Sequence, residues 1–142
     1  MVCKWCVYEQ DEIILKEYTH WKLVLSDCQA LLGWCQAVLK RHEEDFEELY
    51  DEELLELRTV IADWKICLRK SFSPDWFNEQ HMGNMDKHLH LQLVPRYESS
   101  REFNGKTFSD KDFGNPYVIV WKPEEKIFLN TLANQLRKNL GE

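Results

Sequence analysis

The apolar residues of this chain change their spacing abruptly near residue 42, and this change limits the folds open to it. Before that point, residues 12–18, 20–26 and 34–42 are short apolar runs separated by turn-like breaks, a pattern typical of β-strands. From there on, residues 42–70 carry apolar side chains three and four positions apart, which is the spacing of one helix face. One long helix among short strands predicts an α+β fold, with the helix packed on an antiparallel sheet.

The sequence also marks the face and the ends of the predicted long helix. The side chains expected to face the sheet are Leu54, Leu57, Ile61, Trp64 and Leu68. Asp51 suits an N-cap, Arg69 and Lys70 suit the C-terminal end of the helix dipole, and Pro74 follows the helix. We interpret the acidic residues near the helix start as a solvent-exposed face; they are Glu43, Glu44, Asp45, Glu47 and Glu48.

The second half of the chain predicts two more strands and a closing helix. Residues 74–80 and 88–97 are expected to be strands, with a loop at 81–86 between them and a polar segment after them. The closing helix should begin at Pro123 and end at Gly141. Its expected apolar face consists of Leu129, Leu132, Leu136 and Leu140. Because no linker or repeat interrupts the sequence, we predict one domain over residues 1–142.

Charge and cysteine content exclude several classes of protein. The net charge of −7 argues against a nucleic-acid polymer as partner, since such a binder needs clustered Lys and Arg. No apolar run approaches the ~20 residues that span a bilayer, and the acidic N-terminal sequence is unlike a secretory signal. We therefore expect a cytoplasmic protein with no membrane partner. Five cysteines in such a chain indicate thiols or metal ligands rather than disulfides.

The stretch "HLHLQLVPRY", residues 88–97, carries the chemistry of most interest. On a strand, His88, His90 and Gln92 share one face, and the intervening leucines face the core. A neutral imidazole can attack phosphorus, and a carboxamide can donate to a phosphoryl oxygen without acting as a proton shuttle. The row therefore suits attack by His90 on a nucleotide phosphate. The spacing alone equally fits an exposed strand face on which histidines are tolerated.

This stretch and four others, in the same order along the chain, resemble the histidine triad (HIT) superfamily of nucleotidyl hydrolases and transferases. "HMGNMDKHLHLQLVPRY" is similar to the family motif of three histidines alternating with apolar residues, often followed by Pro-Arg. Three further stretches resemble landmarks of the family. "GWCQAVLKRH" resembles its Gly-containing strand, and "WFNEQHMGN" resembles its Asn strand with the following loop. "CKWC" resembles the zinc-type Cys-x-x-Cys of many members. "RYESSREFNGKTF" is more loosely similar to bacterial members. The resemblance implies a HIT-like fold and nucleotide binding.

Gln92 stands where hydrolases of the superfamily usually have the third histidine. A glutamine there is similar to galactose phosphate uridylyltransferases and to some dinucleoside tetraphosphate phosphorylases. That likeness implies that His90 takes the nucleotidyl group covalently and that Gln92 steadies its phosphate, and it puts plain hydrolysis in doubt without excluding it. Since the chain is about half as long as the tandem transferases, the resemblance also implies a homodimer.

Cys3 and Cys6 form a Cys-x-x-Cys pair, a spacing that lets two thiolates hold one Zn²⁺ from a tight turn. Two more ligands are needed, and the resemblance to the transferases implies that they are His42 and His88. These four residues would make a closed structural zinc site. The spacing also fits a pair of free thiols, and this alternative stays open. The remaining cysteines fall in apolar patterns and are expected in the core; they are Cys28, Cys35 and Cys67.

Other candidate binding residues come from the resemblance. Asn78 and Asn84 occupy positions that contact phosphate oxygens in the family, and Gly83 lies in the loop that approaches the phosphate. The ribose-binding position falls on Ser26 without a gap and on Asp27 after a slip of one residue. We favour Asp27, because a carboxylate grips two vicinal hydroxyls better.

Several other polar residues allow two interpretations. Arg41 and Arg96 suit either a phosphate or a surface ion pair, whereas His20 and His81 are interpreted as structural.

The sequence thus predicts an enzyme that acts on a nucleoside phosphate or dinucleoside polyphosphate. It would transfer the nucleotidyl group through a covalent intermediate on His90 to phosphate, a sugar phosphate or water. Two alternatives stay open. One is a nucleotide-binding regulatory protein with little turnover. The other is a zinc-stabilised interaction module that uses the acidic residues 43–48 for a partner.

Overall fold

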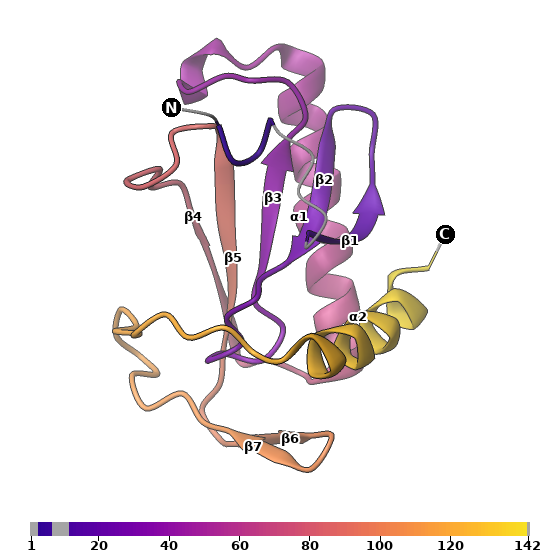
Figure 1. Ribbon diagram of the computed structural model, residues 1–142, viewed down its shortest axis with the longest axis vertical. Coiled ribbons are helices and arrows are strands. Elements are labelled where there is room, and N and C mark those ends of the chain that lie inside the picture. Colours follow the sequence, from indigo (N-terminus) through magenta and orange to yellow (C-terminus); the bar gives the residue numbers. More distant parts are fainter. Residues whose placement is uncertain (1–2, 7–11, 142) are drawn as a thin grey trace.

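A five-stranded antiparallel sheet forms the centre of the molecule in the computed structural model, which describes residues 3–6 and 12–141 (Figure 1). The strands follow the order β1-β2-β3-β5-β4, so that β4 and β1 lie at the two edges. Their bounds are β1 Ile13–Glu17, β2 Trp21–Leu25, β3 Cys35–Leu39, β4 Trp76–Gln80 and β5 His90–Arg96. The predicted α+β class and antiparallel pairing are confirmed.

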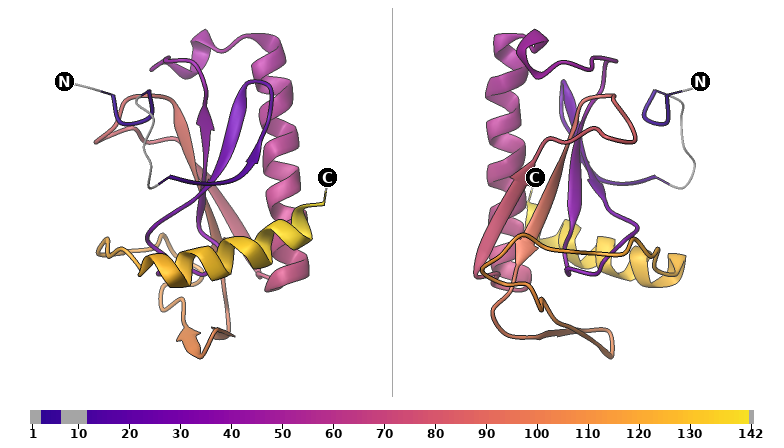
Figure 2. Two further views of the ribbon diagram at one scale, coloured as in Figure 1. Left: turned by 45° about the vertical axis from the view of Figure 1, so that its right-hand side comes forward. Right: turned by 90° about the vertical axis from the view of Figure 1, so that its left-hand side faces the viewer.

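The long helix α1 (Asp51–Ser71) covers one face of this sheet, and the N-terminal turn lies on the other side (Figure 2, right). The closing helix α2 (Lys126–Leu140) packs against α1 and the edge strand β1. A 3₁₀ turn (Phe46–Glu48) precedes α1. Between β5 and α2, the strands β6 (Arg101–Phe103) and β7 (Lys106–Phe108) form a separate hairpin. Within the described residues, no helix combines the length and apolar character needed to cross a bilayer.

The core lies between α1 and the sheet, and it includes the alternating leucines in and just before β5. Leu89, Leu91 and Leu93 are all buried there, as period-two alternation predicts. The buried helix side chains that meet the sheet are Leu57, Val60, Trp64, Cys67 and Leu68. Leu54, predicted on this face, is 39% exposed instead. The contact stripe is thus centred on Trp64, and it gains Val60 and Cys67, which the predicted stripe did not include.

The start of α1 differs from the prediction of a helix from residue 42. Residues 42–45 have no regular structure, the 3₁₀ turn follows them, and the helix begins at Asp51 with Tyr50 at the N-cap position. Glu53 holds this start, because Oε1 accepts the backbone N–H of Tyr50 at 2.8 Å and the carboxylate also binds Arg41. Arg41 is therefore an ion-pair partner and not a free cation. The acidic residues 43–48 lie in this loop and turn, so they are no helix face.

Two further elements of the second half differ from the prediction. The closing helix begins at Lys126, because Pro123 forms an isolated antiparallel bridge with Cys28 and continues the extended chain. The segment predicted only as polar contains the β6–β7 hairpin. Its two-residue loop, Asn104–Gly105, has φ values of 52° and 79°, the conformation for which Asn-Gly is the preferred pair.

Gly33 fixes the entry to β3. Its φ of 98° favours glycine, and a Cβ there would collide with the buried side chain of Leu68. Trp64 Nε1 donates to the Gly33 carbonyl, and Gly33 N–H donates to Gln29 Oε1 at 2.8 Å. These contacts determine the position of Trp34, the next residue, whose indole reaches the candidate site.

Candidate functional site

His90 and Gln92 lie side by side on the sheet face opposite α1. Both belong to β5, and their neighbours across the ladder with β3 are Val38 and Gln36. His88 lies just before β5, which begins at His90, and its ring turns toward the N-terminal cysteines. The three polar side chains of the row therefore serve two adjoining sites.

The hydrogen bonds of His90 leave one ring nitrogen available. Nδ1 lies 2.7 Å from the carbonyl oxygen of His88, so it carries the proton in the neutral ring, and Nε2 keeps a lone pair. Burial lowers the pKa of His90 below its usual value, although the bond to the His88 carbonyl opposes this shift. A neutral imidazole with an accessible lone pair is the form that can act as a nucleophile.

The amide of Gln92 has a fixed orientation. Trp34 Nε1, which can only donate, lies 2.7 Å from Gln92 Oε1, and Gln36 Nε2 lies 3.2 Å from the same oxygen. With Oε1 accepting both bonds, the NH₂ group remains as the donor, and no hydrogen bond among the described residues occupies it. Gln92 thus presents N–H groups beside His90, where an anionic oxygen would be stabilised.

A cavity of about 390 Å³ lies over these two residues, a size that suits a small-molecule ligand. Its lining comes from several segments: Lys4, Trp5, Asp27, Gln36, Met82, Gly83, Asn84, Met85, Asp86, His90, Gln92 and Trp121. Three residues predicted to bind the nucleotide, Asp27, Gly83 and Asn84, are thus placed with His90 and Gln92. Gly83 has φ of 66°, a conformation that favours glycine.

Ser26 and Asp27, the two alternatives for the ribose position, differ in environment. Ser26 is 1% exposed, and its hydroxyl accepts the N–H of Cys28. Asp27 is exposed and lines the cavity. Of the two, only Asp27 can reach a ligand without a rearrangement of the chain.

Asn78 is placed apart from the other predicted binding residues. It shares the sheet face of Gln92, but it pairs with Val94, farther along β5, and lines a different groove of about 690 Å³. Its Oδ1 accepts a hydrogen bond from Arg96 at 3.0 Å. The larger groove contains no histidine or cysteine among the described residues, so the smaller cavity is the one with nucleophilic chemistry.

Arg96 forms a buried ion pair and does not face the cavity of His90. Its guanidinium donates to both carboxylate oxygens of Asp110 at 2.7 and 3.1 Å, and both side chains are at most 5% exposed. Burial alone would raise the pKa of Asp110, but hydrogen bonds from Arg96 and from the Tyr97 N–H outweigh it and lower that pKa. The pair ties the segment after β7 to the end of β5.

We expect Arg96→Met to lower the free energy of unfolding by about 3 kcal/mol, because Asp110 would stay buried without its partner. Urea unfolding at pH 7 measures this, with Arg58→Met on the exposed side of α1 as the matched control. Since the pKa of Asp110 is lowered, the contribution of the pair is complete above pH ~4 and is lost as pH falls through the folded-state value. A variant as stable as wild type at pH 7 would show that the pair contributes nothing.

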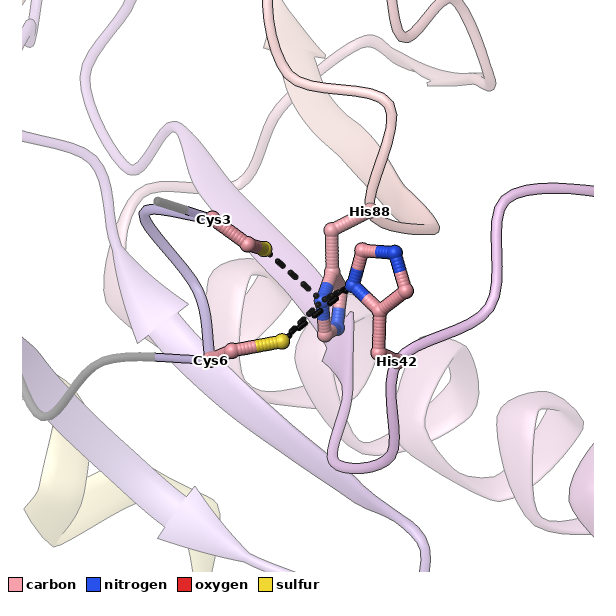
Figure 3. A group of neighbouring side chains, drawn as sticks. All are labelled: Cys3, Cys6, His42 and His88. Atoms are coloured by element: carbon pink, nitrogen blue, oxygen red, sulfur yellow. Dashed lines mark hydrogen bonds between the residues drawn. The ribbon is translucent and has the colours of Figure 1, made fainter. Parts of the chain in front are cut away.

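Cys3, Cys6, His42 and His88 converge from three parts of the chain (Figure 3). The cysteines come from the N-terminal turn, His42 from the loop after β3, and His88 from the segment just before β5. Their ligand atoms all lie within 4.8 Å of one another. Cys3 and Cys6 are the pair expected from their spacing, and His42 and His88 are the two ligands that the resemblance implied.

The spacing of these atoms fits a tetrahedral ion. His88 Nδ1 lies 3.3 Å from Cys3 Sγ, 3.4 Å from Cys6 Sγ and 3.2 Å from His42 Nδ1, and Cys6 Sγ lies 3.2 Å from His42 Nδ1. Zinc bonds of their usual length place ligand atoms about 3.3 to 3.8 Å apart. The observed distances are close to that range, so a small shift of each side chain suffices to hold Zn²⁺.

The surroundings also prepare the two histidines as ligands. His88 Nε2 lies 2.6 Å from the Leu39 carbonyl, which fixes the proton on Nε2 and leaves the Nδ1 lone pair directed at the cysteines. Burial lowers the pKa of His88, which favours the neutral ring that a metal needs. His42 Nε2 lies 3.4 Å from a Glu44 carboxylate oxygen. Carbonyl and carboxylate partners of this kind orient metal-binding imidazoles.

Ionisation of one of the two thiols disfavours ionisation of the other. Burial alone would raise the pKa of Cys3, but hydrogen bonds led by that of Cys6 lower it below the usual value. Loss of hydration and the nearby Cys3 charge raise the pKa of Cys6. A cation between them would allow both to ionise. The other three cysteines are buried, as predicted for core residues, and none of the five forms a disulfide.

Some residues of the site have no motif in the sequence. Trp34 and Gln36 orient Gln92, and Lys4, Trp5 and Trp121 line the cavity. Gln36 had a signal: it is a polar residue on the strand face opposite the core residues Cys35 and Ala37. The others depend on contacts between segments far apart in sequence, and no spacing rule reveals those.

Comparisons with known proteins give a match in structure but not in sequence. No protein-family model matches the chain. No curated protein matches it either.

Solved structures with a similar fold carry histidine triad names. A hypothetical histidine triad nucleotide-binding protein from Sulfolobus tokodaii strain 7 is 19% identical with a TM-score of 0.74, over 97% of this chain and 91% of that one. A histidine triad protein from Marinobacter aquaeolei is 21% identical with a TM-score of 0.67, over 92% and 89%. A Zn-bound histidine triad family protein from Mycobacterium smegmatis is 17% identical with a TM-score of 0.62, over 92% and 86%. At these identities the likeness shows a shared fold, as the resemblance implied.

Proposed function

We propose that this chain binds a nucleoside phosphate or dinucleoside polyphosphate in the cavity over β5 and transfers its nucleotidyl group through His90. The observation that carries the proposal is the pairing of His90 Nε2, left free by the bond of Nδ1 to the His88 carbonyl, with the donor end of Gln92. A nucleophile and an oxyanion donor are thus adjacent on one strand. The shared fold with histidine triad proteins supports the same function.

The proposed reaction has two displacement steps. In the first, Nε2 of His90 attacks the phosphorus of the bound nucleotide; an N–P bond forms, and the P–O bond to the leaving group breaks, with its electron pair going to the leaving oxygen. In the second, an oxygen of phosphate, a sugar phosphate or water attacks the same phosphorus. The N–P bond then breaks, its electron pair returns to Nε2, and the acceptor loses its proton to solvent. Gln92 N–H groups stabilise a non-bridging oxygen in both steps.

The proposed ligand contacts follow the lining of the cavity. Asp27 would accept hydrogen bonds from ribose hydroxyls, and the lining of the cavity by Asp27, Gly83, Asn84 and His90 supports this proposal. Asn78 would act on the substrate only after releasing Arg96. We therefore rank it below the other three as a binding residue.

Zinc is proposed as the resident metal, held by Cys3, Cys6, His42 and His88. When bound, it would supply structural cross-linking, because all four protein ligands would close the tetrahedron and leave no position for substrate. His88 would then anchor the segment whose carbonyl fixes the tautomer of His90. A zinc site that needs Cys3 and Cys6 as reduced thiols fits the proposed cytoplasmic location, where thiols stay reduced.

We also propose that the protein is a homodimer. The support is the position of β4 at the edge of the sheet, with Trp76 on it 66% exposed. An unpaired edge with a large exposed aromatic side chain favours association with a second chain.

The test is intact-protein mass spectrometry after brief incubation with ATP, GTP, UTP, dinucleoside polyphosphates and UDP-sugars, with an alkaline quench that preserves phosphohistidine. We expect a mass gain of one nucleotidyl group that maps to His90. Nucleotide consumed without a trapped adduct would point to hydrolysis with a short-lived intermediate. If no donor is bound, consumed or attached, the proposed function is wrong.

A further inference from the structure

The turn between the two N-terminal cysteines faces the cavity of His90. Cys6 N–H donates to the Cys3 carbonyl at 3.2 Å and closes this turn. The two residues inside it, Lys4 and Trp5, both line the cavity. The cluster in Figure 3 therefore adjoins the candidate active site, and its own backbone turn forms one wall of that site.

Trp5 lies against the proposed nucleophile. Its ring centroid is 5.4 Å from that of His90, with an interplanar angle of 43°. The indole covers one side of the imidazole and contributes to its burial, since His90 is only 8% exposed. Trp5 Nε1 is itself buried and has no hydrogen-bond partner among the described residues. Such an unpaired donor is costly, and a polar ligand atom that reaches it would offset this cost.

Lys4 supplies the positive charge that a phosphate ligand needs. Among the described residues that line the cavity, it is the only lysine or arginine, whereas Asp27 and Asp86 are both acidic. Two carboxylates alone would repel a nucleoside phosphate. The Lys4 ammonium lies 4.8 Å from the centroid of the Trp5 ring, so the two side chains of the turn are in contact.

We infer that Lys4 and Trp5 form a part of the nucleotide site that metal loading holds in place. Lys4 binds the phosphate group and Trp5 packs on the His90 ring, so zinc binding and nucleotide binding strengthen each other. This inference rests on the proposed function. It assigns a second role to the Cys-x-x-Cys turn, whose cysteines alone suggested only structural stabilisation.

Lys4→Met tests the phosphate contact. In the zinc-loaded protein we expect about tenfold weaker binding of nucleoside monophosphates by calorimetry, the size of one exposed charge-assisted contact. Binding of the parent nucleosides should not change, and Lys4→Arg should retain most of the affinity. The matched control is Lys138→Met, which removes one exposed lysine from α2. The zinc content of every variant is measured, so that loss of metal is not mistaken for loss of the contact.

The coupling needs a second measurement. We expect removal of zinc with a chelator to weaken monophosphate binding to wild type about tenfold or more, because the turn then loses its anchor. In the Lys4→Met/Trp5→Leu double variant, zinc should have little effect on that affinity. An equal zinc effect in wild type and in the double variant would overturn the coupling.

The outcomes separate this inference from the proposed function. If wild type binds monophosphates and Lys4→Met binds them equally well, the role of Lys4 is wrong and the proposed function stands. If zinc-loaded wild type binds no nucleoside phosphate at all, the proposed function is wrong and the inference is wrong with it.

Discussion

His90→Ala is expected to lower the turnover of nucleoside phosphates at least a thousandfold, the scale on which loss of a covalent nucleophile acts. The substitution removes the imidazole whose Nε2 is free to attack, and His88, just before β5, cannot replace it because its Nε2 is bonded to the Leu39 carbonyl. Nucleotide affinity should change only a few-fold, because Gln92, Asp27 and Lys4 remain. Steady-state kinetics with the preferred donor, together with calorimetry, measure both quantities.

The cost of His90→Ala to folding should be small. The side chain contributes one hydrogen bond, to the His88 carbonyl, worth about 1 kcal/mol. His81→Ala is the matched control, since His81 is an exposed histidine before the same strand, and it should keep full turnover. Near-normal turnover in His90→Ala, or retention of the covalent adduct, would show that His90 is not the nucleophile.

The elements that followed local periodicity were predicted well. The middle of α1 and the alternation of β5 are examples, because their apolar side chains repeat with the spacing of the element itself. The segment before α1 shows where this reasoning ends. Its acidic residues suit a helix, yet Arg41 binds Glu53 and the Glu48 carbonyl and holds the chain in a loop. That loop is what carries His42 to His88.

The candidate site divides in the same way. Residues that belong to a sequence motif were predicted individually, and the structure brings most of them together. His90 lies with Gln92, and Cys3 and Cys6 lie with their two histidines. Asn78 was not placed with them. It lies two positions along β4 from Gln80, the residue that pairs with Gln92, and there Arg96 of the ion pair with Asp110 donates to its side chain. Lys4 and Trp5 had no signal of their own, since only the folded turn brings them to His90.

Metal loading is expected to have the largest effect on stability. The four proposed ligands join the N-terminal turn, the loop after β3 and the start of β5, segments separated by up to 85 residues. Metal that binds only the folded chain stabilises it by about 4 kcal/mol when its free concentration is a thousand times the dissociation constant. For a chain of 142 residues this corresponds to a rise in Tm of about 10 °C.

Differential scanning calorimetry of zinc-loaded and chelated protein measures this shift, and the double variant Cys3→Ser/Cys6→Ser is the control. The variant should unfold near the Tm of the chelated wild type and should not respond to added zinc, because serine is a poor zinc ligand. Its three remaining cysteines are buried, so a zinc response that wild type shows and the variant lacks comes from the cluster. Equal Tm values for loaded and chelated wild type would show that the cluster does not hold a stabilising metal. The 3.2–3.4 Å contacts among its sulfur and nitrogen atoms would then be hydrogen bonds within a metal-free turn.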